Sequence, residues 1–287
     1  KSTFPHRICS PSLSTGFSSL EEEEFLYLCF FQPSPSDSQM IRTVRQELLH
    51  HVRHPAPMNP GILRINLQGG HPASLNPRLA ADIHSHIFSN FLFEGLVRCN
   101  ESGNIEMAIA KKIEISPCKT RYTFHLRSSL WSNGEEVTAY DFEKTWKRTL
   151  LSGSAACLKP DLFFLIRNAK LAKEGKVPIQ EVGIFAHSAS KLCVELASPC
   201  PYFLNLLATP SFFPMYEMDH EPSVFNGSFL LADYKPESYV FLSQNPFYWN
   251  AKSIPIRGIH ATFISDPYAA YKEFELGNLD LLGDPTS

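Results

Sequence analysis

The chain has 287 residues, of which 44% are hydrophobic and 19% charged, so it can close an apolar core and is neither collagen-like nor fully disordered. Its 26 Lys and Arg residues and 29 Asp and Glu residues give a formal net charge of -3, which provides no basic field for nucleic acid. The seven cysteines are scattered without a CxxC pair, so neither a disulfide framework nor a zinc site is predicted.

Residues 1–59 are predicted to form a poorly ordered extension, because they are rich in Ser and Pro. The longest apolar run, at 25–31, is much shorter than the roughly 20 residues that a membrane-spanning helix needs. Glutamates at 21–24 precede this run, where a signal peptide would carry positive charge, so no export signal is visible. Adjacent histidines in a polar tail are more often solvated than metal-bound, so His50, His51 and His54 are left unassigned.

The ordered part is expected to begin with a strand at 62–67, where apolar and polar residues alternate. A turn rich in Gly and Pro follows, and a helix ending near 94–95 is predicted after it from apolar residues at helical spacing, namely Ile83, Ile87, Phe91 and Leu92. His84 and His86 lie two positions apart in this helical pattern and therefore point in different directions. We do not expect them to bind a metal.

The clearest period-2 pattern is at 121–127, which predicts a strand with one buried face. After an Asn-Gly turn, Thr138 is expected to cap a helix whose third residue is Asp141, a variant of the capping box. Aromatic and aliphatic residues then recur every four positions and predict a buried helix face, which is formed by Phe142, Trp146 and Leu150.

Further strands are predicted at 192–196, 239–243 and 259–264, and further helices at 202–207 and 268–276, the last of them ended by Gly277. Strands and helices are thus interspersed without a strict βαβ repeat, which indicates an α/β or α+β protein. The common short motifs for hydrolysis, nucleotide binding and metal catalysis are absent from the sequence, so we do not expect an enzyme.

One long segment resembles a known family. Residues 122–148, YTFHLRSSLWSNGEEVTAYDFEKTWKR, are similar to the signature of the oligopeptide-binding proteins of ABC importers, solute-binding protein family 5. In that family a Tyr-x-Phe-x-Leu-Arg strand leads into Trp-Ser-Asp/Asn-Gly, and Val-Thr-Ala-x-Asp-Phe opens a helix that bears Trp and Arg. Shorter segments resemble the family in its own order along the chain: LNP at 75–77, FEGL at 93–96, PYF at 201–203, NG at 226–227, NPFYWN at 245–250 and ELGNLD at 275–280.

The resemblance implies an α/β fold, namely a lobe of the type II periplasmic solute-binding kind with an inserted α+β subdomain. We expect residues 60–93 and 217–287 to form the core sheet of lobe I and residues 94–216 to form the inserted subdomain. The strand at 62–67 should then share a sheet with part of 239–264. In the family a second lobe follows the region that corresponds to the end of this sequence, so we expect the second lobe to be missing from this chain.

The resemblance also implies where a ligand binds. Family members close on an extended peptide, whose main chain pairs with the protein. The lobe I segment that meets the peptide corresponds to Ala81, Asp82 and Ile83, and Asn226 and Gly227 are further candidates. Residues 154–158 stand where the family has an aromatic pocket residue. No catalytic residue, metal or cofactor is expected.

Two interpretations of function remain open. In the first, the chain is the substrate-binding component of an ABC peptide importer, a periplasmic or membrane-associated monomer with oligopeptides and the permease subunits of the inner membrane as its partners. In the second, it is a truncated remnant or interaction module that keeps the lobe I fold and binds no peptide, because half of the contacts are missing. A hydrolase is disfavoured, since no catalytic motif is present.

Overall fold

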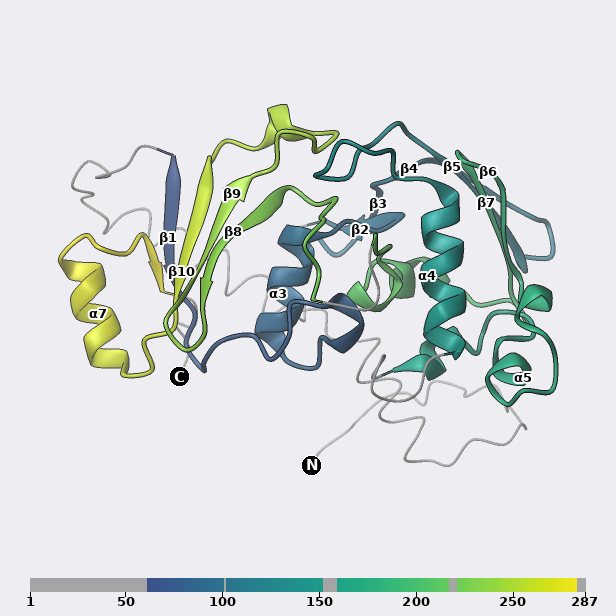
Figure 1. Ribbon diagram of the computed structural model, residues 1–287, viewed down its shortest axis with the longest axis horizontal. Coiled ribbons are helices and arrows are strands. Elements are labelled where there is room, and N and C mark those ends of the chain that lie inside the picture. Colours follow the sequence, from purple (N-terminus) through teal and green to yellow (C-terminus); the bar gives the residue numbers. More distant parts are fainter. Residues whose placement is uncertain (1–60, 101, 152–158, 217–220, 283–287) are drawn as a thin grey trace, which may run out of the picture. The chain divides into compact units, whose positions relative to one another are not determined.

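A five-stranded mixed sheet joins strands from both ends of the described chain. The computed structural model describes residues 61–100, 102–151, 159–216 and 221–282, all of which belong to one compact unit. The strand order across this sheet is β11 (Leu281–Leu282), β1 (Ile62–Asn66), β10 (Gly258–Thr262), β9 (Tyr239–Gln244) and β8 (Phe229–Lys235). β1 runs parallel to β10 and β11, whereas β8, β9 and β10 are antiparallel to one another in turn (Figure 1).

The pairing of β1 with β10 confirms the expectation that the strand at 62–67 shares a sheet with part of 239–264. Its register runs from Ile62 opposite Gly258 to Asn66 opposite Thr262. Arg64 on β1 is also joined to Asp280 by an ion pair of 2.7 Å, which ties β1 to the chain just before β11. The assignment of these segments to a lobe core, with an inserted subdomain at 94–216, stays a prediction.

The stretch between β1 and β8 contains two further sheets. A four-stranded antiparallel sheet has the order β4 (Ala110–Ile115), β5 (Arg121–Leu126), β7 (Lys191–Glu195) and β6 (Ile184–Ser188). A short hairpin pairs β2 (Val97–Cys99) with β3 (Ile105–Met107). β5 has the predicted alternation, because Tyr122, Phe124 and Leu126 are buried while the residues between them are more exposed.

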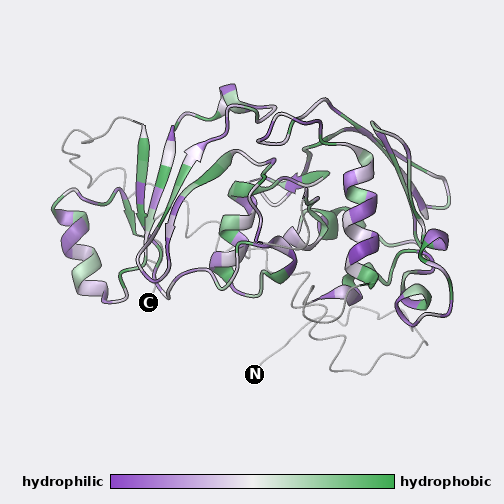
Figure 2. Cartoon of the chain, in the orientation of Figure 1, coloured by the Kyte–Doolittle hydropathy of each residue, from purple (hydrophilic) through white to green (hydrophobic). Residues whose placement is uncertain are grey.

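Helix α4 (Ala139–Leu151) contacts β6 and β7 and carries much of the core beside this sheet. Its side chains Phe142, Trp146 and Leu150 are completely buried, as predicted. The Nε1 of Trp146 donates a hydrogen bond to the carbonyl of Phe212 at 2.9 Å. Figure 2 shows hydrophilic and hydrophobic residues alternating along α4, as expected for an amphipathic helix.

The predicted cap of α4 is present in a modified form. The Asp141 carboxylate accepts hydrogen bonds from the main-chain N–H of Thr138 at 2.7 Å and from its hydroxyl at 2.9 Å. In a full capping box the hydroxyl would instead accept a hydrogen bond from the third helical N–H. Of the two capping-box hydrogen bonds, only the one from the Thr138 N–H to the Asp141 carboxylate is present. The Thr138 hydroxyl donates a second hydrogen bond to the same carboxylate.

Helix α3 (Ile83–Leu92) forms where a helix was predicted. Ile83 is 60% exposed. The buried residues of the helix, which include two serines, are His84, Ser85, Phe88, Ser89 and Leu92. The Ser89 hydroxyl donates to the main-chain carbonyl of Ser85 at 2.7 Å, so it needs no other partner. Small serines whose hydroxyls are satisfied locally can thus lie against the core as apolar residues do.

The remaining helices are short. α5 (Ala169–Lys173) precedes β6, while α6 (Phe203–Leu207) and α7 (Pro267–Glu275) confirm the two helices predicted at 202–207 and 268–276. Gly277 follows α7 with a φ of 76°, in the left-handed region that favours glycine after a helix. None of the helices in the described ranges is both long enough and apolar enough to span a membrane. Residues 1–59, including their histidines, lie outside the described part of the chain.

Candidate functional site

Helix α3 packs beside the carboxyl ends of two parallel strands. β1 and β10 run in the same direction and end at Asn66 and Thr262. The ring of Phe88 on α3 packs edge-on against Phe263, directly after β10, with centroids 6.4 Å apart. In open α/β sheets, ligands bind outside the carboxyl ends of strands, so this edge is the natural place for a binding segment.

Asp82 holds the segment in front of α3 in place. One carboxylate oxygen accepts from the Ser85 N–H at 2.9 Å, and the other accepts from the Ser85 hydroxyl and from the Ala73 N–H. Burial alone would raise the pKa of Asp82, but these hydrogen bonds outweigh it and hold the pKa below its usual value. Asp82 is thus an ionised helix cap that also anchors the loop after β1. Both oxygens of its carboxylate already accept hydrogen bonds from the protein.

The neighbouring residues Ala81 and Ile83 are open to solvent. Ala81 is exposed, and it lies between Ala80 (ψ 100°) and Asp82 (φ -110°, ψ 164°), which both have extended backbone. Within the described ranges, the main-chain N–H and C=O of Ala81 have no hydrogen-bonding partner. An extended segment with free main-chain groups can pair with another extended chain, as an edge strand does.

Asn226 and Gly227 lie elsewhere, at the C-terminal end of α3, and their contacts are structural. Asn226 is only 1% exposed and makes hydrogen bonds to the main-chain N–H and C=O of Glu94. A Cβ on Gly227 would come within 2.5 Å of main-chain atoms of Phe91, Leu92 and Phe93, so only glycine allows this approach. The structure therefore does not bring these two residues together with Ala81, Asp82 and Ile83, and their peptide-binding role stays a prediction.

Glu94, Asn226, Tyr248 and Trp249 meet in a cluster that we call the junction. The buried carboxylate of Glu94 forms its centre. It accepts hydrogen bonds from the Tyr248 hydroxyl at 2.7 Å and from the indole N–H of Trp249, and Arg98 lies 3.3 Å away. Burial raises the pKa of Glu94, although the hydrogen bonds from Trp249 and Tyr248 oppose this. Burial and the nearby Glu94 carboxylate likewise raise the pKa of Tyr248.

Arg127, at the end of β5, adds a cation to the same junction. Its guanidinium lies 3.6 Å from the centre of the Trp249 ring, in a cation–π contact. Trp249 thus touches both Arg127 and Glu94, and it links the region after β9 with the end of β5 and the segment after α3. The sequence contains a signal for this cluster, because FEGL at 93–96 and NPFYWN at 245–250 both resemble family segments, but periodicity does not show that the two segments meet.

The other candidate positions from the sequence are the two histidines of α3 and residues 154–158. His84 and His86 both lie on α3, and the described residues contain no group of three His, Cys, Asp or Glu side chains that could hold a metal ion. Burial lowers the pKa of His86. Residues 154–158, where the family has an aromatic pocket residue, lie outside the described part of the chain.

Comparison with known proteins identifies relatives of this fold. The family described as "Bacterial extracellular solute-binding proteins, family 5 Middle" matches residues 104–287. The oligopeptide-binding protein OppA of Bacillus subtilis is 34% identical over 235 residues, which cover 78% of this chain and 43% of OppA. The dipeptide-binding protein of Lactococcus lactis is 30% identical over 226 residues, which cover 72% of this chain and 40% of that protein.

Solved structures agree with the sequence relatives. Listeria monocytogenes OppA bound to peptide superposes with a TM-score of 0.72 and 27% identity, over 77% of this chain and 46% of that structure. Haemophilus influenzae OppA in complex with RPPGFSPFR superposes with a TM-score of 0.71 and 27% identity, over 77% of this chain and 45% of that structure.

These matches confirm the resemblance and the α/β solute-binding fold that it implied. The chain spans less than half the length of the relatives it matches. The family model covers well over half of the chain, including the signature at 122–148. This protein therefore belongs to family 5 of the bacterial extracellular solute-binding proteins.

Proposed function

We propose that this chain supplies the lobe I part of an oligopeptide-binding protein that works with an ABC importer. In this role it presents Ala81 and Ile83 to an extended peptide outside the cytoplasmic membrane, and the bound peptide is passed to the permease subunits. The observation that carries the proposal is the exposed main chain of Ala81, which lies between two residues with extended backbone and next to Asp82, whose hydrogen bonds fix the segment in front of α3.

The geometry supports main-chain recognition in preference to side-chain recognition. The Asp82 carboxylate is engaged by Ser85 and Ala73, and Ala81 has no functional side chain, so the groups on offer are main-chain N–H and C=O. Main-chain pairing does not depend on the peptide's sequence, which suits a protein that accepts many peptides. Ile83, 60% exposed beside this backbone, offers an apolar surface for whichever side chain lies above it.

The proposal is tested by titrating the whole chain with the peptide RPPGFSPFR in a calorimeter. We expect saturable binding with a dissociation constant below about 1 mM. The expected affinity is set this low because the chain matches less than half of the length of its relatives. Ala81→Pro removes the main-chain N–H and should weaken binding by about three- to tenfold, the value of one hydrogen bond.

Ala81→Ser is the matched control, because it keeps the N–H and should leave the affinity within about twofold. Absence of binding at about 1 mM, with the chain folded, would contradict the proposal and favour the remnant that keeps the lobe I fold without binding peptide. Equal weakening by both variants would also count against it, because main-chain pairing at Ala81 would then not be the interaction that matters.

A further inference from the structure

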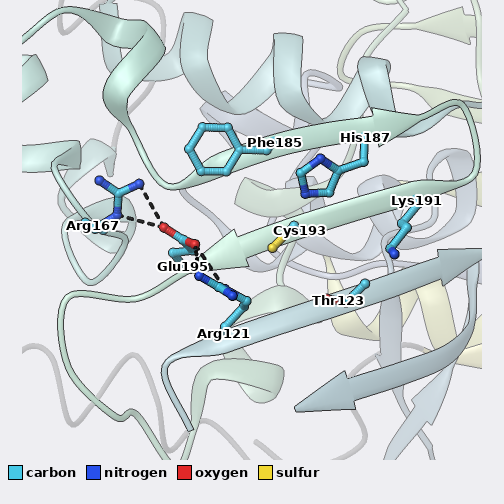
Figure 3. A pocket seen from close by; sticks show the side chains of 8 residues that line it. All are labelled: Arg121, Thr123, Arg167, Phe185, His187, Lys191, Cys193 and Glu195. Carbon is cyan, nitrogen blue, oxygen red and sulfur yellow. Dashed lines mark hydrogen bonds and ion pairs between the residues drawn. The ribbon is translucent and has the colours of Figure 1, made fainter. Parts of the chain in front are cut away.

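The solvent-facing side of the four-stranded sheet contains a hollow of about 490 Å³ that the proposed function does not use. It lies across β5, β7 and β6, and Figure 3 shows the side chains that line it: Arg121, Thr123, Arg167, Phe185, His187, Lys191, Cys193 and Glu195. Residues of the same strands that point to the opposite side, such as Tyr122, Leu192 and Val194, are buried. The hollow is therefore part of the outer face of the sheet.

Small side chains form the floor of the hollow. Thr123 on β5 is the register partner of Cys193 on β7, and Cys193 is in turn the partner of Phe185 on β6. The floor is low because Thr and Cys are short, whereas Phe185 and the long cationic side chains rise around it (Figure 3). The result is a trough with an aromatic wall formed by Phe185.

One end of the trough carries two arginines and one carboxylate. Arg121 lies 2.8 Å from one oxygen of Glu195, and Arg167 lies 2.8 Å from the other. Each guanidinium also donates a hydrogen bond from its Nε–H to Glu195. Each arginine thus uses Nε and one terminal nitrogen, and its other terminal nitrogen has no partner in the described ranges. Two positive charges against one negative charge leave this end with a net charge of +1.

The other end carries Lys191, with His187 beside it. Both side chains are exposed, and Lys191 has no ion-pair partner among the described residues. Lys191 and Glu195 lie four positions apart on the same face of β7, which corresponds to about 13 Å at the rise of a β-strand. The trough therefore has a cationic group at each end, in a chain whose net charge is -3.

We propose that this trough binds an extended acidic segment of a partner protein, in which two carboxylates lie four residues apart. In an extended chain, residues i and i+4 point to the same side and are separated by the same distance of about 13 Å. One carboxylate then reaches the free nitrogens of Arg121 and Arg167, the other reaches Lys191, and the side chain at i+2 packs over the floor beside Phe185. A single small anion cannot reach both ends, which is why we assign the trough to a polypeptide segment.

This inference does not rest on the proposed function, because it uses none of the residues at 81–83. It is tested on the full chain by fluorescence anisotropy with a labelled peptide that is acetylated and amidated and carries two glutamates four residues apart. At low salt, about 20 mM, we expect saturable binding that weakens several-fold at about 200 mM, since exposed charges are then screened. Lys191→Glu should weaken binding by about tenfold.

Lys235→Glu is the matched control, because it makes the same charge change at an exposed site on β8, in the other sheet. It should leave the affinity within about twofold. Lys191 is exposed, so its variant is expected to fold, and circular dichroism checks this. Ile83→Asp should change binding of RPPGFSPFR without changing binding of the acidic peptide.

Four results would overturn the inference. The first is no binding of the acidic peptide at about 1 mM and low salt. The second is equal weakening by Lys191→Glu and Lys235→Glu, which would show attraction to overall charge only. The third is equal binding of peptides whose glutamates are adjacent or replaced by glutamine, which would show that the trough recognises no specific ligand. The fourth is full competition by phosphate, which would assign the trough to a small anion.

Discussion

Asn226 binds both main-chain polar groups of Glu94, across 132 positions of sequence: its amide oxygen accepts from the Glu94 N–H at 3.1 Å, and its amide nitrogen donates to the Glu94 carbonyl at 2.9 Å. This pair closes the point where the chain leaves α3 and where it returns towards β8. The position is buried, so each of these main-chain groups would lose its partner if the amide were removed.

Replacing Asn226 with Leu should therefore cost about 2–4 kcal/mol of unfolding free energy, since two buried main-chain groups are left unsatisfied. Urea denaturation measures this. Asn90→Ala is the control, because Asn90 is exposed and its one hydrogen bond, to the His86 carbonyl, lies on the surface of α3. The control should cost less than about 1 kcal/mol. Similar losses for the two variants would contradict the role assigned to Asn226.

Gly227 is expected to be the least tolerant position of this junction. An added Cβ would lie 2.5 Å from three main-chain atoms at the end of α3 and in its C-cap residue Phe93, and backbone cannot rotate away as a side chain can. Gly227→Ala should destabilise the protein by about 1–3 kcal/mol or prevent folding. The neighbouring Ser228→Ala, which loses only a hydrogen bond of 3.5 Å, should be nearly neutral. A fully stable Gly227→Ala variant would show that α3 can shift away.

The hydroxyl of Tyr248 should matter more than that of Tyr239, although both donate to carboxylates. Tyr248 donates to the buried Glu94 at 2.7 Å, and Tyr239 donates to Asp233 at an exposed site at 2.6 Å. Tyr248→Phe should cost about 1.5–3 kcal/mol, because it leaves a buried carboxylate one donor short. Tyr239→Phe should cost less than about 1 kcal/mol, because water replaces the hydroxyl. Equal values in urea denaturation would mean that Glu94 is satisfied without Tyr248.

Much of the fold follows from local patterns, and the exceptions have physical causes. The strand β5 and the helix α4 were predicted because each has one fully buried face of large apolar residues. β4 was not predicted, because most of its residues are exposed and only Ala110 is buried, so apolar alternation is nearly absent. Such a strand is stabilised by its pairing with β5, which no local pattern reveals.

The candidate site was harder to predict than the fold. Ala81, Asp82 and Ile83 were placed by resemblance alone, and the structure adds that Asp82 is a helix cap whose carboxylate is already engaged. Glu94 is the clearest omission. A carboxylate next to Phe93 has no periodic pattern, and its burial depends on Trp249, 155 positions away. Long-range pairing of polar groups leaves almost no trace in a single sequence, whereas the burial of apolar faces does.

Glu195 should make the protein's stability depend on pH in the acid range. Burial alone would raise the pKa of Glu195, but hydrogen bonds from Arg121 and Arg167 outweigh it and hold the pKa below the ordinary value of 4.5. The folded state then binds fewer protons than the unfolded state as the pH falls through this range, so the stabilisation is present above pH 4.5 and is lost as the pH falls through the lowered pKa.

Glu195→Gln should accordingly show a smaller fall in unfolding free energy between about pH 5 and pH 3 than the unmodified chain, as measured by urea denaturation at each pH. The double variant Arg121→Gln, Arg167→Gln should flatten the same part of the curve, because it removes both donors that lower the pKa of Glu195. If the double variant retains the full acid dependence while Glu195→Gln does not, the carboxylate is stabilised by something other than the two arginines. If both variants retain it, the acid sensitivity of the protein originates at another carboxylate, and the Arg–Glu–Arg arrangement contributes only to the charge of the trough.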